Sequence, residues 1–151
     1  MSDKWDRRFL GLAMDPYSTW SKDPSTQVGA VITRGNRQVS QGYNGFPAGV
    51  DDSPDRYADR EFKYRAVIHA EANAIIWAQE DLTGCTIYVW PMPPCGGCAG
   101  KIIQAGILRV VTVSPTPAQL ERWGLDIMIA QKMFEEAGVE VVYLNEELNE
   151  K

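Results

Sequence analysis

The chain has 151 residues, a length that suits one domain spanning 1–151, and its hydrophobic (44%) and charged (23%) fractions exclude disordered, collagen-like and low-complexity classes. Fifteen basic and 20 acidic residues give a net charge of −5, which argues against a nucleic-acid partner because dedicated nucleic-acid binders carry a basic excess. Because no apolar run approaches the roughly 20 residues that span a bilayer, and the N-terminus has no secretory apolar region, we expect no membrane partner and a cytoplasmic protein.

The N-terminal segment predicts an amphipathic helix. Trp5, Phe9 and Leu12 recur at helical spacing, so we expect a helix over residues 3–19. Pro16 lacks an amide donor and should kink or end this helix.

A hairpin, a loop and a second helix follow. Residues 27–33 are typical of a strand, 34–36 of a turn, and 37–43 alternate as in a second strand. Residues 44–54 contain several prolines and glycines and predict a loop. Residues 61–78 predict a helix in two pieces.

In the second half, strands alternate with helices: a strand at 86–90, a short helix at 99–103, a strand at 108–113, a helix at 126–137 and a strand at 139–144. Gly138 follows the last helix in the usual capping position. The acidic residues 145–151 are expected to form a solvated tail. The order α-β-β-α-β-α-β-α-β predicts a three-layer α/β/α fold with a five-stranded mixed sheet.

His69, Cys95 and Cys98 are the candidate metal ligands. Zinc takes imidazole nitrogen and thiolate sulfur in tetrahedral geometry, and three protein ligands leave open the fourth position that a catalytic site needs. Cys95 and Cys98 are three residues apart at the start of a predicted helix, whose positive end favours their thiolate forms. The third cysteine, Cys85, precedes a buried strand and is expected to be a small core residue rather than a fourth ligand.

Glu71 completes an H-x-E…P-C-x-x-C pattern that zinc deaminases share. Taken singly, these residues read as a core histidine, a redox or structural-metal cysteine pair and a solvated carboxylate, but together they favour catalysis. Zinc lowers the pKa of a bound water towards neutrality. Glu71, which is not a ligand, is expected to take that water's proton and deliver it to a ring nitrogen and a departing amine.

With these residues in place, the sequence resembles the cytidine deaminase superfamily, and specifically the deoxycytidylate (dCMP) deaminases. Besides the metal pattern, the resemblance rests on residues 21–30, SKDPSTQVGA, and on 42–49, GYNGFPAG. It implies zinc-dependent hydrolysis of dCMP to dUMP and ammonia. The implied substrate contacts are Thr26 and Val28 at the base, Asn44 at the sugar hydroxyl and the Ala70 amide at the cytosine carbonyl.

The same resemblance implies regulation by nucleoside triphosphates, with dCTP activating, dTTP inhibiting and Mg²⁺ bound to the triphosphate. It also implies a homo-oligomer, a hexamer. The implied effector loop contains Gly42, Tyr43, Asn44, Gly45 and Phe46. The pair Asn44–Gly45 is also an ordinary turn signal.

Residues 56–65, just before the candidate histidine, contain four basic and two acidic residues within an acidic chain. Such a run is either a solvated face or a site for the 5′-phosphate of dCMP. The candidates for phosphate contacts are Arg60, Lys63 and Arg65, with Tyr64 as a hydroxyl donor.

Two other functions fit parts of the pattern. A tRNA adenosine deaminase shares His-Ala-Glu and a stretch like residues 94–100, but it would need a basic surface for RNA, which the net charge of −5 opposes. A non-catalytic nucleotide sensor could keep zinc for structure alone. Glu71 weighs against the sensor, because a structural zinc has no use for a proton carrier.

Overall fold

The structure, a computed structural model, describes residues 3–144. The predicted acidic tail at 145–151 therefore lies outside the described residues. No helix within residues 3–144 is long and apolar enough to cross a membrane.

A five-stranded mixed sheet forms the middle layer, as predicted. Its strands, in spatial order, are β2 (Arg37–Tyr43), β1 (Gly29–Arg34), β3 (Thr86–Trp90), β4 (Arg109–Thr112) and β5 (Glu140–Tyr143). Strand β1 is antiparallel to β2 and to β3, whereas β3, β4 and β5 are parallel. The β1–β2 hairpin starts two residues later than predicted.

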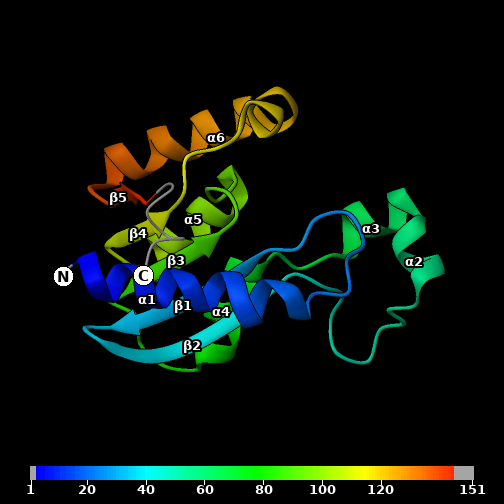
Figure 1. The fold of residues 1–151 in the computed structure, drawn as a ribbon, viewed down its shortest axis with the longest axis horizontal. Helices are drawn as coiled ribbons and strands as arrows, with labels where there is room; N and C mark the ends of the chain where they lie inside the picture. The colour runs from blue at the N-terminus through cyan, green and yellow to red at the C-terminus, as the bar shows by residue number, and fades with distance from the viewer. Residues whose placement is uncertain (1–2, 145–151) are drawn as a thin grey trace.

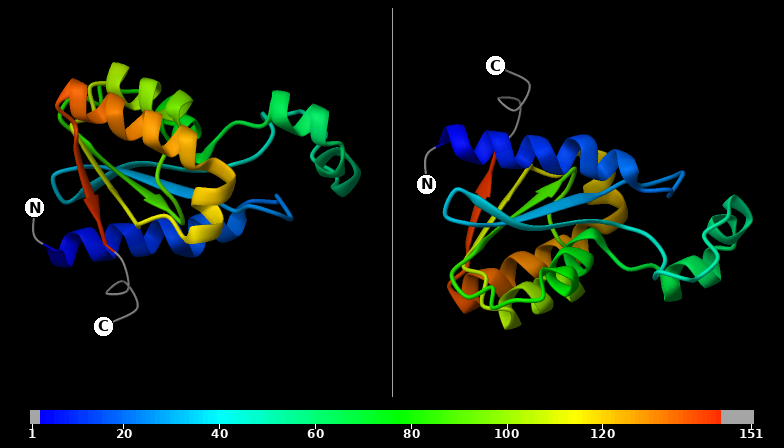
Figure 2. Two further views of the ribbon diagram at one scale, coloured as in Figure 1. Left: turned by 90° about the horizontal axis from the view of Figure 1, so that it is seen from above. Right: turned by 90° about the horizontal axis from the view of Figure 1, so that it is seen from below.

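Helices cover both faces of the sheet, which confirms the three-layer fold. Helix α1 (Asp3–Leu12) lies on one face, and α4 (Ala70–Ala78), α5 (Gly96–Gln104) and α6 (Pro117–Ala137) lie on the other (Figures 1 and 2). Because strand side chains alternate between faces, neighbouring residues enter different cores. Val31, Tyr88 and Val111 pack toward α1, and the opposite core contains Ala30, Ile32, Ile87, Val89 and Val110.

The N-terminal helix breaks near Pro16, as predicted. Helix α1 continues into a π-helical turn, η1 (Ala13–Tyr17), in which Asp15 has extended backbone angles, and then into a 3₁₀ turn, η2 (Ser18–Trp20).

Two helical segments differ from the prediction. Helix α6 begins nine residues before the predicted residue 126, because Thr116 and Gln119 form a reciprocal capping box and Pro117 occupies the first turn. A short helix, α2 (Pro54–Ala58), occupies a stretch for which no helix was predicted. The predicted two-piece helix is confirmed as α3 (Arg60–Ala66) and α4.

Residues 46–67, here called the arm, carry α2 and α3 and project away from the sheet (Figure 1). Gly45 and Ile68 pair at its base through two backbone hydrogen bonds of 3.0 and 2.8 Å. Within the arm, Phe46 stacks on Tyr57 at 4.5 Å and meets Phe62 edge to face at 5.5 Å. The arm thus has a small aromatic cluster of its own.

Candidate active site

The three predicted metal ligands converge at the N-termini of two neighbouring helices. His69 precedes α4 and Cys95 precedes α5, with Cys98 in the first turn of α5. His69 Nδ1 lies 3.4 Å from Cys95 Sγ and 3.3 Å from Cys98 Sγ, and the three ligand atoms all lie within 4.8 Å of one another. Tetrahedral zinc would separate such nitrogen and sulfur atoms by about 3.5 Å. The three side chains therefore fit a zinc ion.

The environment of Cys95 favours the thiolate that zinc requires. A hydrogen bond from Cys98 lowers the pKa of the Cys95 thiol well below its usual range, and the His69 ring lowers it further against the opposing effect of burial. The backbone amide of Cys98 also donates to Cys95 Sγ at 3.4 Å. Asp126 Oδ1 of α6 accepts the Gly96 amide at 3.0 Å and so ties the start of α5 to α6.

Glu71 lies in the first turn of α4, where its side chain lines the same cavity as His69 and Cys95. The residue is only 4% exposed. Burial raises the pKa of the Glu71 carboxyl, whereas the neighbouring His69 lowers it. A carboxyl group with a raised pKa, held beside a metal site, is suited to carrying a proton.

A cavity of about 700 Å³ opens onto these groups. It is large enough for a small ligand such as a nucleotide. Among the residues predicted from the sequence, its walls include Thr26, Val28, Asn44, Arg60, Lys63, Tyr64, Ala70 and Glu71. The fold therefore brings the predicted base, sugar and phosphate contacts to one cavity.

Asn44 is buried, and its side chain is engaged with the cavity wall formed by residues 23–28, here called the 23–28 loop. Asn44 Oδ1 accepts the Val28 amide at 2.9 Å. Its Nδ2 donates to the Thr26 carbonyl at 2.8 Å and to Asp23 at 3.3 Å. Asn44 thus holds this loop in place, and only its oxygen has a lone pair left for a sugar hydroxyl.

The three basic residues predicted to bind the phosphate have different surroundings. Arg60 donates to the Tyr64 hydroxyl at 3.0 Å within the cavity wall. Lys63 forms an ion pair of 2.9 Å with Asp23. Arg65 does not line the cavity: it is exposed and pairs with Glu61 at 3.6 Å. The prediction of Arg65 as a phosphate contact is therefore wrong for this cavity.

Helix α6 contributes cavity residues that the sequence prediction missed. Arg122, Trp123 and Asp126 line the cavity, but α6 was predicted to begin only at residue 126. Arg60, and after it Arg122, lowers the pKa of the Tyr64 hydroxyl, so both positive charges lie near this group, and Arg60 also donates a hydrogen bond to it. Neither arginine forms an ion pair with a carboxylate of residues 3–144.

The predicted effector loop is largely engaged in packing. Gly42 lies against α4 so closely that a Cβ atom there would meet the Ala70 carbonyl and the Ala74 amide at 2.6 Å. Gly45 pairs with the base of the arm, and Phe46 belongs to the arm's aromatic cluster. Tyr43 is exposed.

Comparisons with known proteins agree with this geometry. A family model described as the cytidine and deoxycytidylate deaminase zinc-binding region matches residues 3–114. The chain is 53% identical over 144 residues to an uncharacterized deaminase in the luxG 3′ region of Aliivibrio fischeri, which covers 95% of this chain and 96% of that one. It is 38% identical over 143 residues to the deoxycytidylate deaminase of Mus musculus, covering 90% and 77% of the two chains. Apo dCMP deaminase from cyanophage S-TIM5 has the same fold, with a TM-score of 0.74 at 22% identity over 95% of this chain and 100% of that one.

Proposed function

This chain belongs to the cytidine and deoxycytidylate deaminase family, and on that premise we propose that it is a zinc-dependent enzyme that hydrolyses dCMP to dUMP and ammonia. The observation that carries the proposal is one cavity whose walls hold two sets of residues: His69 and Cys95 of the zinc-fitting cluster with buried Glu71, and Arg60 with Arg122, which form no ion pair with a carboxylate of residues 3–144. The first set suits removal of an amine from a base, and the second suits a phosphate.

His69, Cys95 and Cys98 would hold the zinc ion. Zinc in a site with one open position supplies a Lewis acid that lowers the pKa of water towards neutrality. Glu71 is the proton carrier of the reaction: the attacking water supplies two protons in succession, and the Glu71 carboxylate carries the first to the ring nitrogen and the second to the amine, which leaves as ammonia. Its burial excludes bulk water from this proton transfer.

The 23–28 loop and the first turn of α4 would bind the nucleoside. Thr26 and Val28 form the side of the cavity against which a pyrimidine can pack. Ala70 opens helix α4, where the first backbone amides have no helical partner and could donate to the cytosine carbonyl. These contacts orient the base with its exocyclic amine toward Glu71.

Arg60, Arg122 and the Tyr64 hydroxyl would bind the 5′-phosphate. Arg60, which donates to the Tyr64 hydroxyl, and Arg122, which lies near it, form no ion pair with a carboxylate of residues 3–144 and leave a local positive charge within a chain of net charge −5. Guanidinium groups bind phosphate oxygens through paired, charge-assisted hydrogen bonds. This cluster favours a nucleotide over a free nucleoside.

We also propose, from the resemblance of residues 42–49, that dCTP activates and dTTP inhibits the enzyme with Mg²⁺ bound to the triphosphate. The exposed ring of Tyr43 offers a surface on which an effector base could stack. Rates on dCMP with and without each triphosphate test this regulation, and unchanged rates would contradict it.

We propose a homo-oligomer, a hexamer, as the working assembly. Helix α6 exposes Leu125, Met128 and Ile129, which share one helical face and are 74%, 67% and 47% exposed. A contiguous apolar face of this kind is typical of an interaction surface. Light scattering of the purified protein measures the assembly, and a monomer at micromolar concentration would contradict it.

One assay series tests the proposed activity. Ammonia release is measured with dCMP, CMP, dCTP and deoxycytidine, and with a tRNA stem-loop, before and after chelation of the metal. We expect dCMP to be the best substrate, and the rate to disappear on chelation and return with zinc. Turnover of the stem-loop alone would support the adenosine deaminase instead, and no turnover of any substrate would support the nucleotide sensor.

A further inference from the structure

The arm forms one wall of the cavity yet stands away from the sheet (Figure 2). Two ion pairs connect it to the segment around the 23–28 loop. Lys22 and Asp52 meet at 3.0 Å, but both side chains are largely exposed. Lys63 and Asp23 meet at 2.9 Å, and their side chains are 17% and 3% exposed. The second pair is therefore the one that water screens least.

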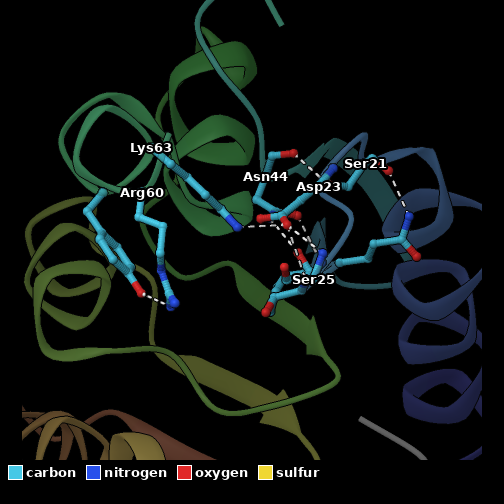
Figure 3. A network of polar contacts seen from close by, with 10 residues as sticks. Ser21, Asp23, Ser25, Asn44, Arg60 and Lys63 are labelled. Atoms are coloured by element: carbon cyan, nitrogen blue, oxygen red, sulfur yellow. Dashed lines mark hydrogen bonds and ion pairs between the residues drawn. The ribbon is translucent and has the colours of Figure 1, made fainter. Parts of the chain in front are cut away.

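Asp23 is a buried carboxylate on which four donors converge (Figure 3). Its Oδ1 accepts the backbone amides of Ser25 at 2.8 Å and Thr26 at 3.2 Å, and the ammonium of Lys63 at 2.9 Å. Its Oδ2 accepts Asn44 Nδ2 at 3.3 Å. One side chain thus sets the backbone of the 23–28 loop, and that loop lines the cavity.

A carboxylate buried to this degree is stable only when its charge is balanced. Lys63 is its only cationic partner among residues 3–144. Figure 3 shows Lys63 pointing toward Asp23, whereas Arg60 reaches a different partner, the Tyr64 hydroxyl. Within the described part of the chain, the positive charge of Lys63 is therefore already balanced by a carboxylate, unlike that of Arg60 and Arg122.

We propose that Lys63 is a positioning residue rather than a phosphate ligand: by neutralising Asp23 it keeps the 23–28 loop in the shape that binds the base and sugar. The inference rests on the proposed deaminase function. It separates the basic residues of the cavity by role. Arg60 and Arg122 recognise the phosphate, while Lys63 acts on the nucleoside through Asp23.

Deoxycytidine, which has no phosphate, is the substrate that distinguishes the two roles. Steady-state rates on deoxycytidine and dCMP are measured for wild type and for Lys63→Met, per folded and zinc-loaded enzyme. We expect KM for deoxycytidine to rise by about tenfold or more, because small displacements of a binding wall have large effects. The change in kcat should be smaller, because Glu71 and the metal ligands lie on other elements.

Two further variants test whether the unbalanced charge of Asp23 causes the rise in KM. In the double variant Asp23→Asn/Lys63→Met no unbalanced charge remains, and the amide oxygen still accepts the Ser25 and Thr26 amides, whereas only the 3.3 Å contact from Asn44 Nδ2 loses its acceptor. Because Asn44 Nδ2 keeps the Thr26 carbonyl, KM for deoxycytidine should return to within about threefold of wild type. Lys132→Met makes the same change on the exposed face of α6, where the lysine side chain is 72% exposed, and should leave KM and kcat for both substrates unchanged.

The outcomes are distinct. If Lys63→Met leaves KM for deoxycytidine unchanged and raises only KM for dCMP, Lys63 is a phosphate ligand and the inference is overturned. A double variant whose KM for deoxycytidine is as high as that of Lys63→Met would also overturn the inference. If Lys63→Met does not fold, the double variant carries the test: it must fold and keep a KM near that of wild type. A wild-type enzyme without activity on dCMP would instead refute the proposed function.

Discussion

Replacing Arg122 by Met should remove much of the enzyme's preference for a phosphorylated substrate. Arg122 is an exposed residue at the cavity wall, and its charge lowers the pKa of the Tyr64 hydroxyl to which Arg60 donates. Methionine keeps much of the apolar length of the side chain but has neither the charge nor the donors. The substitution therefore isolates the electrostatic part of the contact.

The magnitude follows from the exposure of the site. A hydrogen bond to a charged group contributes about 1.5–3 kcal/mol, and water around Arg122 places the contact at the lower end. A loss of about 1.4 kcal/mol is a tenfold loss in kcat/KM. We expect kcat/KM for dCMP to fall roughly tenfold, and that for deoxycytidine to stay within about twofold. Raising the salt concentration should narrow the wild-type preference, because exposed charges are screened.

The assay compares kcat/KM for the two substrates in wild type, Arg122→Met and Arg122→Lys. Lysine keeps the charge but not the planar fork, so its value for dCMP should lie between the other two. An equal loss on both substrates would show that Arg122 supports the cavity wall without contacting phosphate. No loss on either would remove α6 from the substrate site.

Two further predictions concern the supports of the site. Arg109→Met should lower the free energy of unfolding by about 3–5 kcal/mol, because it leaves buried Asp6 without the guanidinium that now binds both its oxygens at 2.8 and 2.6 Å. Thermal denaturation measures this loss, and an unchanged melting temperature would contradict it. Asp126→Ala should weaken zinc binding roughly tenfold, because the Gly96 amide at the start of α5 loses its acceptor. Zinc titration against a chelator measures the affinity, with Asp126→Asn as the matched control. Equal zinc affinities for Asp126→Ala and wild type would contradict the prediction.

The strands and the metal site were predictable because their signals are local. Residues 86–90 alternate between two cores, and the structure has a strand with those bounds. His69, Cys95 and Cys98 belong to short motifs whose ligand atoms face inward once each motif starts a helix. These three candidate ligands were found from residue types and spacing, without knowledge of the fold.

The remaining walls of the cavity depend on contacts between distant segments. The pairing of Lys63 with Asp23 joins residues 40 positions apart, and no local pattern predicts which acid a lysine will meet. The start of α6 is different, because the Thr116–Gln119 capping box was readable in the sequence. Recognising it would have extended the helix over Arg122, although the position of that arginine in the cavity is a property of the tertiary fold.

The most direct test of the account is to measure zinc content and dCMP turnover together in Glu71→Gln and in wild type. Because Glu71 is a proton carrier and not a ligand, the variant should retain about one zinc per chain, as wild type does. Its kcat should fall by at least about 10²-fold, the contribution expected of a positioned acid–base group. A Glu71→Gln enzyme that turns over dCMP at the wild-type rate, or a wild-type enzyme fully active without metal, would contradict the account.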